Sequence, residues 1–263
     1  MKIKVQYINA FTNVLFKGNS AAVIITDDWL SDAVMQLIAT ENNLSETAFI
    51  KPLTPEKYEI RWFSPITEID FCGHATLAAS FVIFSNDHSL KLLTFLTKSV
   101  GELTVIEEDC GYIQMSFPNL KPKVLIDIPD LLLKGLSIAP KEVLLSEQAY
   151  FVVYNAESDV LNVNYNSELL KQLAPFDVVV TAKSNDYDFI SRYFWPANGG
   201  DEDPVTGSIH AGLAPYWSEK LNKKNLVAFQ ASQRGGELQC KVDNGRVYIS
   251  GKAVKYLEGM ITV

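Results

Sequence analysis

An internal repeat limits the folds that this chain of 263 residues can adopt more than any other feature. Four short segments of the first half return in the same order in the second half, at offsets of 131 to 135 residues. The matched pairs are 61–65 with 192–196, 72–74 with 206–208, 101–103 with 236–238, and 111–116 with 245–250. Because four ordered matches at a nearly constant offset are hard to obtain by chance, the sequence predicts two homologous lobes.

Each lobe is expected to be rich in strands and to contain one long helix. Residues 2–7 alternate polar and apolar side chains, as a half-buried strand does. The turn Asp243-Asn244-Gly245 is typical of a type I′ hairpin. In each copy a helix pattern follows the repeated glycine turn, beginning at Ala75 and at Ala211. The sequence therefore predicts two β-rich lobes related by a pseudo-twofold, each presenting a glycine turn and a helix.

A proline-rich connector separates the two copies. Prolines occur at positions 118, 122 and 129, between the last strand of the first copy and the elements of the second. We therefore expect an N-terminal lobe of residues 1–117 and a C-terminal lobe of residues 118–263. The alternative for the last strand, 253–263, is that it pairs with the first lobe.

Charge and composition exclude several classes of protein. The net charge is −8 and no basic stripe offsets it, which argues against nucleic acid and anionic membranes as partners. No apolar run approaches the roughly 20 residues that span a bilayer. The three cysteines are widely spaced and form no C-x-x-C pair, so we expect a cytoplasmic protein without a disulfide framework.

Cofactor motifs are also missing from the sequence. The three histidines lie far apart, without an H-x-x-H or H-x-x-x-H pair, so no metal site is predicted. There is no G-x-G-x-x-G and no G-x-x-x-x-G-K-[ST], so nucleotide binding is not indicated. The sequence therefore predicts no cofactor.

The two glycine turns indicate a site for a small anion. In both copies an acidic residue, Asp70 or Asp203, precedes the glycine, and a helix follows. The first backbone amides of a helix have no partner within it, and its dipole favours negative charge there. Two such helices directed at one ligand would suit a small carboxylate and would stabilise an enolate-like transition state.

Candidates for proton transfer lie near these turns. Glu46, His74 and Asp203 are the predicted catalytic residues, and histidine suits acid–base work near neutral pH. Each has a structural alternative, since Glu46 could be an exposed carboxylate between a helix and a strand. Cys72 could be a small buried apolar residue. The residues expected to be structural or solvated are His210, Glu68 and Asp70.

The chain resembles the phenazine biosynthesis PhzF-like isomerase family over nearly its full length. The motifs that carry this resemblance are residues 18–23 (GNSAAV), 44–47 (LSET), 71–76 (FCGHAT) and 202–208 (EDPVTGS). The resemblance implies an α+β fold of the diaminopimelate epimerase type. In that fold two pseudo-symmetric lobes each wrap a mostly antiparallel sheet around a central helix, which agrees with the internal repeat.

The resemblance also implies roles for individual residues. Glu46 matches the acid/base that shuttles a proton during isomerisation of a dihydro-hydroxyanthranilate-type substrate. His74, Asp203 and Ser208 match supporting site residues. The residues assigned to substrate binding are Asn19, Gly73, Gly207 and Ser208. Relatives often form homodimers, so a homodimer is an expectation by resemblance.

Two-thiol racemisation is disfavoured by one position of the repeat. Diaminopimelate epimerase and proline racemase use two opposed cysteines, and here Cys72 matches one position while Thr206 occupies the other. A hydroxyl group cannot replace a thiolate as a base, because its pKa is far too high. The predicted function is a cofactor-independent isomerase that moves a proton on a small carboxylate. The alternatives are an epimerase or racemase of an amino or hydroxy acid, including a Cys72-assisted one, and a non-catalytic binding member of the family.

Overall fold

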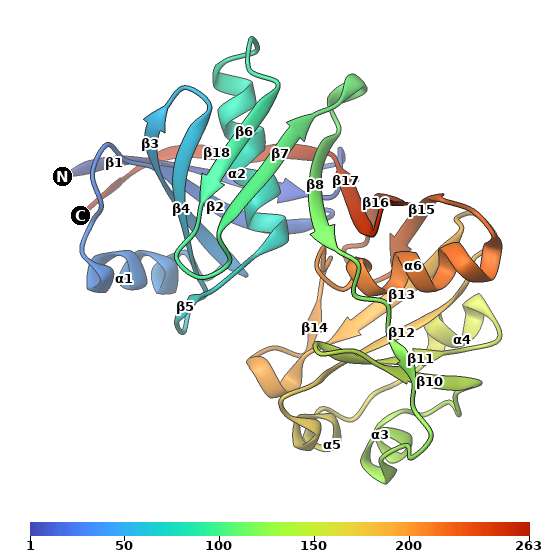
Figure 1. Ribbon diagram of the computed structural model, residues 1–263. Coiled ribbons are helices and arrows are strands. Elements are labelled where there is room, and N and C mark those ends of the chain that lie inside the picture. The colour runs from blue at the N-terminus through green and yellow to red at the C-terminus, as the bar shows by residue number, and fades with distance from the viewer. The chain divides into compact units, whose positions relative to one another are not determined.

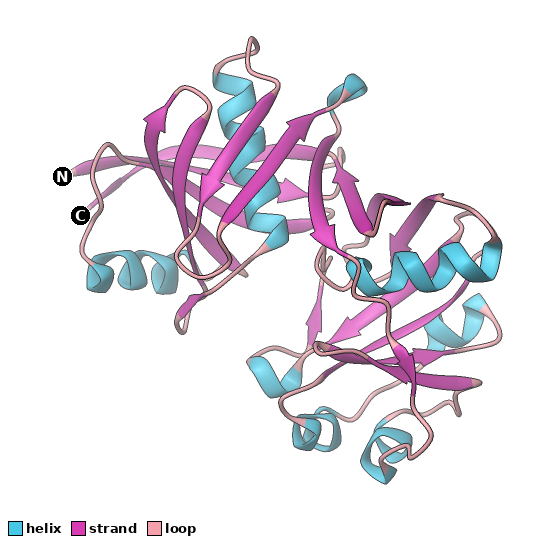
Figure 2. Cartoon of the chain, viewed as in Figure 1, coloured by secondary structure: helices cyan, strands magenta, loops and turns pink.

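The computed structural model describes all residues, Met1–Val263, and the chain divides into two compact units. The first unit contains Met1–Ser116 together with Ser250–Val263, and the second contains Phe117–Ile249. Figure 1 labels the elements, and Figure 2 shows that strands outnumber helices in both units.

The first unit is a mixed sheet with two helices. Its sheet runs in the order β18-β1-β2-β3-β4-β6-β7-β8, with parallel pairing only between β2 and β3 and between β4 and β6. The elements are β1 (Lys2–Ala10), β2 (Asn19–Ile25), α1 (Asp32–Asn42), β3 (Glu46–Thr54), β4 (Lys57–Phe63), β5 (Glu68–Ile69), α2 (Gly73–Asn86), β6 (Leu92–Leu96), β7 (Glu102–Glu107), a short 3₁₀ helix (Asp109–Gly111), β8 (Ile113–Pro118) and β18 (Ala253–Thr262).

The sheet of the first unit curves around α2, as Figure 1 shows. All side chains from Gly73 to Ser80 are buried, and α2 contacts strands β1, β2, β3, β7 and β18. The sequence of this helix is apolar or small on every side, so it has no face suited to water and is stable only inside a core. The start of α2 is therefore fixed at a set position relative to the strands.

The C-terminal strand belongs to the first unit. The sequence left open whether residues 253–263 return to the first lobe, and β18 pairs antiparallel with the whole of β1. The register runs from Lys2 opposite Thr262 to Ala10 opposite Ala253. The last strand thus completes the sheet that the first strand begins.

The second unit repeats this arrangement. Its pairings are β9–β10 and β10–β11 antiparallel, β11–β12 parallel, β12–β13 antiparallel, β13–β15 parallel and β15–β16 antiparallel. The elements are β9 (Lys123–Val124), α3 (Asp130–Gly135), β10 (Glu142–Leu145), β11 (Ala149–Val153), α4 (Glu157–Asn162), α5 (Ser167–Leu170), 3₁₀ turns at Lys171–Leu173 and Pro196–Asn198, β12 (Asp177–Lys183), β13 (Phe189–Phe194), β14 (Glu202–Asp203), α6 (His210–Leu221), β15 (Asn225–Gln230), β16 (Gly236–Asp243) and β17 (Arg246–Gly251).

The strand order confirms the predicted repeat and the α+β fold class. The parallel and antiparallel pairings of β2-β3-β4-β6-β7 recur in the same order in β11-β12-β13-β15-β16. The predicted hairpin turn is also present, because Asn244 and Gly245 both have positive φ between β16 and β17.

Both central helices begin slightly before the predicted residues, Ala75 and Ala211, but they begin at different positions relative to their glycines. In the first copy α2 starts at Gly73, whereas α6 starts at His210, three positions after Gly207. Residues 207–209 instead form a tighter turn, in which the amide of His210 donates to the carbonyl of Gly207 at 3.1 Å. The two glycine turns are thus related in sequence but differ in their first turn.

Candidate active site

Glu46 and His74 meet at the start of α2. Glu46 is the first residue of β3 and His74 is the second residue of α2. His74 Nε2 lies 2.8 Å from Glu46 Oε2, and both side chains are buried. A buried carboxylate is costly unless an opposite charge or a donor faces it, and Glu46 Oε2 has no hydrogen-bond partner, so the ion-pair contact with His74 is what offsets its burial.

The other face of the His74 ring meets Asn19. The amide nitrogen Nδ2 of Asn19 lies 3.2 Å from His74 Nδ1, and the hydroxyl of Ser45 donates to Asn19 Oδ1 at 3.0 Å. In this orientation His74 Nδ1 accepts from Asn19 in the neutral ring, which leaves the proton on Nε2, opposite Glu46. Asn19, at the start of β2, therefore holds the ring with Nδ1 toward its own amide and Nε2 toward Glu46.

Burial and mutual contact shift the pKa values of His74 and Cys72. Burial alone would lower the pKa of His74, but the negative charges that Cys72 and Glu46 can carry outweigh it, and the pKa lies well above its ordinary value. Burial raises the pKa of Cys72 to about 11, with a further rise from Glu46 that His74 only partly opposes. Cys72 is therefore a thiol at neutral pH.

Cys72 completes a cluster of three groups that could bind a metal. Its Sγ lies 3.4 Å from His74 Nδ1, and the ligand atoms of Glu46, Cys72 and His74 lie within 4.8 Å of one another. A metal would need the Cys72 thiolate and would have to displace the contacts that Asn19 and Glu46 make with His74. The cluster as built is an acid–histidine pair beside a thiol.

Asp203 and Thr206 of the second unit are bonded to each other. The Thr206 hydroxyl donates to Asp203 Oδ2. Gln230 holds the same turn, since its Oε1 accepts from the Thr206 amide at 2.9 Å and its Nε2 donates to the Asp203 carbonyl at 2.9 Å. Thr206 occupies the position of Cys72 in the repeat, and its hydroxyl proton is already engaged by Asp203.

His210 supports the same turn from inside the core. It is fully buried, and its Nδ1 lies 2.8 Å from the carbonyl oxygen of Thr206. Burial lowers the pKa of His210 to about 4, although the bond to Thr206 opposes this. The ring is therefore neutral near pH 7 and donates Nδ1–H to Thr206, which is a structural role.

The sequence interpretation missed Asp177, which is the counterpart of Glu46. Glu46 begins β3 and lies opposite Ala21 of the parallel neighbour β2, while Asp177 begins β12 and lies opposite Ala149 of the parallel neighbour β11. The offset between the two acids is 131 residues, the same as that between segments 61–65 and 192–196. Applying this offset to Glu46 would have found Asp177 from the sequence.

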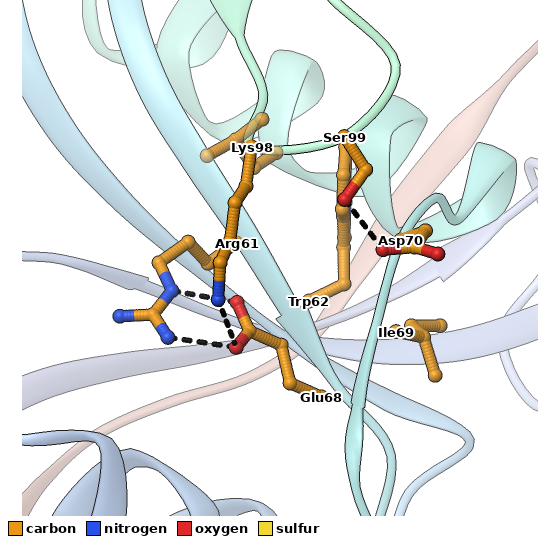
Figure 3. A pocket seen from close by; sticks show the side chains of 8 residues that line it. Arg61, Trp62, Glu68, Ile69, Asp70, Lys98 and Ser99 are labelled. Carbon is orange, nitrogen blue, oxygen red and sulfur yellow. Dashed lines mark hydrogen bonds and ion pairs between the residues drawn. The ribbon is translucent and has the colours of Figure 1, made fainter.

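Figure 3 shows a hollow in the first unit whose lining includes none of these groups. Its charged groups are paired with one another: Arg61 contacts Glu68 through two bonds of 2.7 and 2.8 Å, and Lys98 Nζ lies 3.4 Å from Glu68. Ser99 donates to Asp70. The expectation that Glu68 is a solvated loop acid is wrong, because Glu68 joins β5 to β4 through Arg61.

The same brace occurs in the second unit. Arg192 of β13 contacts Glu202 of β14 through bonds of 2.8 and 2.9 Å. A bidentate pair of arginine and carboxylate is among the stronger surface interactions, and it fixes the short strand that leads into each glycine turn. The hollow of Figure 3 thus lies beside a structural ion pair.

The structure places the predicted site residues in two sets. Asn19, Glu46, Gly73 and His74 lie together in the first unit, around the start of α2. The second set is Asp203, Gly207 and Ser208, which lie in or beside the turn before α6. Two repeated lobes, each with a sheet curved around a central helix, form a fold of the diaminopimelate epimerase type, as the sequence predicted.

The chain belongs to the PhzC-PhzF family of phenazine biosynthesis-like proteins, whose family model matches residues 8–259. It is 44% identical over 261 residues to a protein of Halalkalibacterium halodurans named an uncharacterized isomerase, covering 98% of this chain and 97% of that protein. The resemblance that the sequence motifs indicated is thereby confirmed.

Solved structures agree with this assignment. A PhzF family protein of Enterococcus faecalis superposes with a TM-score of 0.94 at 41% identity, over 100% of both chains. A hydroxyproline epimerase from Agrobacterium vitis superposes with a TM-score of 0.63 at 10% identity, over 99% of this chain and 91% of that one, and this likeness concerns the fold. In this chain no helix is long and apolar enough to cross a membrane.

Proposed function

We propose that this protein is a cofactor-independent isomerase that transfers a proton on a small carboxylate substrate, with Glu46 as the acid/base. The observation that carries the proposal is the contact of 2.8 Å between Glu46 and His74, both buried, at the start of α2. Family relatives carry the name isomerase, which supports the reaction class.

The proposed reaction begins with an ionised Glu46. Its carboxylate takes a proton from an activated carbon of the substrate, and the electron pair of the broken C–H bond passes into the neighbouring conjugated system. The hydrogen of the carboxyl group formed on Glu46 exchanges with water, and the O–H bond then breaks as a proton passes to a different carbon of the conjugated system. His74, whose Nε2 lies 2.8 Å from Glu46 Oε2, holds the carboxyl group in place for both steps.

Anion binding is assigned to the two glycine turns. The amide of Gly73 is the first of α2, so no partner within the helix accepts its hydrogen, and the helix dipole favours negative charge there. In the second unit Gly207 and Ser208 are the proposed substrate-binding residues, and Asp203 is proposed to act with the turn that it holds through Thr206. Asn19 is also proposed as a substrate-binding residue, and its contact with His74 places it beside Glu46.

A Cys72-assisted epimerase of an amino or hydroxy acid is the second candidate. The observation in its favour is the distance of 3.4 Å between Cys72 Sγ and His74 Nδ1. The raised pKa of Cys72, about 11, opposes it, because only the thiolate is a base. The absence of a second thiol at Thr206 opposes the two-base version.

The test has two stages. Small aromatic and amino carboxylates are screened by thermal shift, in which a ligand at 100 times its dissociation constant stabilises the fold by about 2.7 kcal/mol. Hits are then incubated with the protein in D₂O and followed by NMR. A shifted double bond with deuterium at the new C–H position supports the isomerase, and inversion at one carbon without a bond shift supports the epimerase. Binding without any exchange of hydrogen contradicts both and indicates a binding protein.

A further inference from the structure

Asp177 and Ser208 of the second unit stand where Glu46 and His74 stand in the first. The strand registers make Asp177 the counterpart of Glu46, and the offset of the glycine turn makes Ser208 the counterpart of His74. In the first unit the acid contacts the histidine directly. In the second unit serine is shorter than histidine, and two further side chains connect it to the acid.

Tyr193 and Gln148 form this connection. The hydroxyl of Tyr193, on β13, donates to Asp177 Oδ2 at 2.5 Å. Nε2 of Gln148, which lies just before β11, is 3.0 Å from the Tyr193 oxygen and 3.0 Å from Ser208 Oγ. Asn198 donates to the other carboxylate oxygen of Asp177 at 2.8 Å. Tyr193 is 4% exposed and Asp177 is 9% exposed, so water competes little for these bonds.

The chemistry of these groups gives the chain of bonds a single direction. A carboxylate only accepts, so the one hydroxyl proton of Tyr193 is committed to Asp177. The Tyr193 oxygen then accepts from Gln148, which fixes the amide with its NH₂ group toward Tyr193 and Ser208. Ser208 Oγ must accept the second amide hydrogen, and its own proton has no acceptor in the structure.

We propose that Asp177, Tyr193 and Gln148 are positioning residues that make the Ser208 hydroxyl a donor, directed at the carboxylate of the substrate. This inference rests on the proposed assignment of Ser208 to substrate binding. Ser208 is half-buried, so its proton reaches the surface of the second unit at the turn before α6. A serine hydroxyl can otherwise donate or accept, and a preset donor selects a negative group over a neutral one.

The proton positions are tested directly by neutron diffraction from crystals exchanged into D₂O. The expected result is deuterium on Tyr193 facing Asp177, the amide deuterons of Gln148 facing Tyr193 and Ser208, and the Ser208 deuteron pointing away from Gln148. A Ser208 deuteron that points to Gln148, or a reversed amide, overturns the proposal. This measurement needs no substrate, so its outcome is independent of whether the protein is an isomerase.

Binding tests the selectivity for a carboxylate. Benzoate, 2-aminobenzoate and proline are each compared with their amides by calorimetric titration and thermal shift. Ser208→Ala and Tyr193→Phe are each expected to weaken carboxylate binding about tenfold or more and amide binding much less, as a hydrogen bond to a charged group implies. The double variant is expected to be no weaker than Ser208→Ala alone, because Tyr193 acts through Ser208.

The matched control is Tyr154→Phe. Tyr154 is also buried in the second unit, and its hydroxyl donates to the carbonyl of Ile138 at 3.0 Å, outside this chain of bonds. Gln148→Met is the second variant, which keeps the length of the side chain and removes the amide. Equal effects of Tyr193→Phe and Tyr154→Phe, additive losses in the double variant, or no preference of the wild type for carboxylates over amides overturn the proposal.

Discussion

His74 Nε2 lies 2.8 Å from Glu46 Oε2, and this contact joins the start of a helix to the start of a strand inside the first unit. Both groups are buried, so neither charge is screened by water as a surface pair is. The proposed role of Glu46 as the acid/base depends on this contact.

Glu46→Gln is expected to reduce isomerase activity by at least about a hundredfold, and up to ten-thousandfold, because an amide cannot accept the substrate proton. Deuterium incorporation from D₂O is expected to fall to the same extent. The control is Glu41→Gln, since Glu41 is an exposed carboxylate at the end of α1. Full activity of Glu46→Gln, or an equal loss in Glu41→Gln, contradicts the assignment of Glu46 as the acid/base.

Cys72→Ala is expected to retain activity within about threefold, because burial keeps Cys72 protonated at neutral pH, with a pKa of about 11. Some loss of stability is expected from the deleted sulfur atom, of about 1 kcal/mol in urea unfolding. Cys240→Ala is the matched control, since Cys240 is also a buried thiol, in β16 of the second unit. A loss of activity as large as that of Glu46→Gln would instead favour the Cys72-assisted epimerase.

The free energy of unfolding should depend on His74 above neutral pH. The folded pKa of His74 is raised above its unfolded value of about 6.5, so its stabilising effect is complete below pH 6.5 and is lost as pH rises through the folded pKa. The loss amounts to about 1.4 kcal/mol for each unit of difference between the two pKa values. Urea unfolding of the wild type and His74→Gln between pH 6 and 10 measures it. If the free energy of unfolding depends on pH in the same way in both proteins, the pKa of His74 is not raised by folding.

His210 should have the opposite effect, on the acid side. Its folded pKa of about 4 lies below the unfolded value of about 6.5, so its contribution is present above pH 6.5 and is lost as pH falls toward 4. The loss should reach about 3 kcal/mol. His210→Asn keeps a donor for the carbonyl of Thr206 and should remove this slope, whereas His88→Asn, at an exposed position, should leave it unchanged. If the unfolding free energy of His210→Asn still falls between pH 6.5 and pH 4 as in the wild type, groups other than His210 cause the fall.

The repeat, the fold class and the family could be predicted from the sequence because each depends on local patterns. Alternating side chains mark strands, and a helix without a polar face must be buried, as α2 is. The glycine turns drew attention to His74 and Ser208, and the motif around Glu46 supplied the proposed acid/base. None of these steps needs to know which strands are neighbours.

The composition of the candidate site in the second unit depends on pairing between strands that are distant in the sequence. The register of β12 on β11 shows that Asp177 is the counterpart of Glu46, a match that the repeat offset of 131 residues also gives. Gln148 and Tyr193 come from two further segments, and a chain of hydrogen bonds from Asp177 to Ser208 requires all of them at distances near 3 Å. The sequence by itself determined two similar lobes, each with a glycine turn before its central helix. The tertiary structure decided that the acid of the first lobe contacts its histidine directly, while that of the second reaches its serine through a tyrosine and a glutamine, because the side chain after the glycine differs in length.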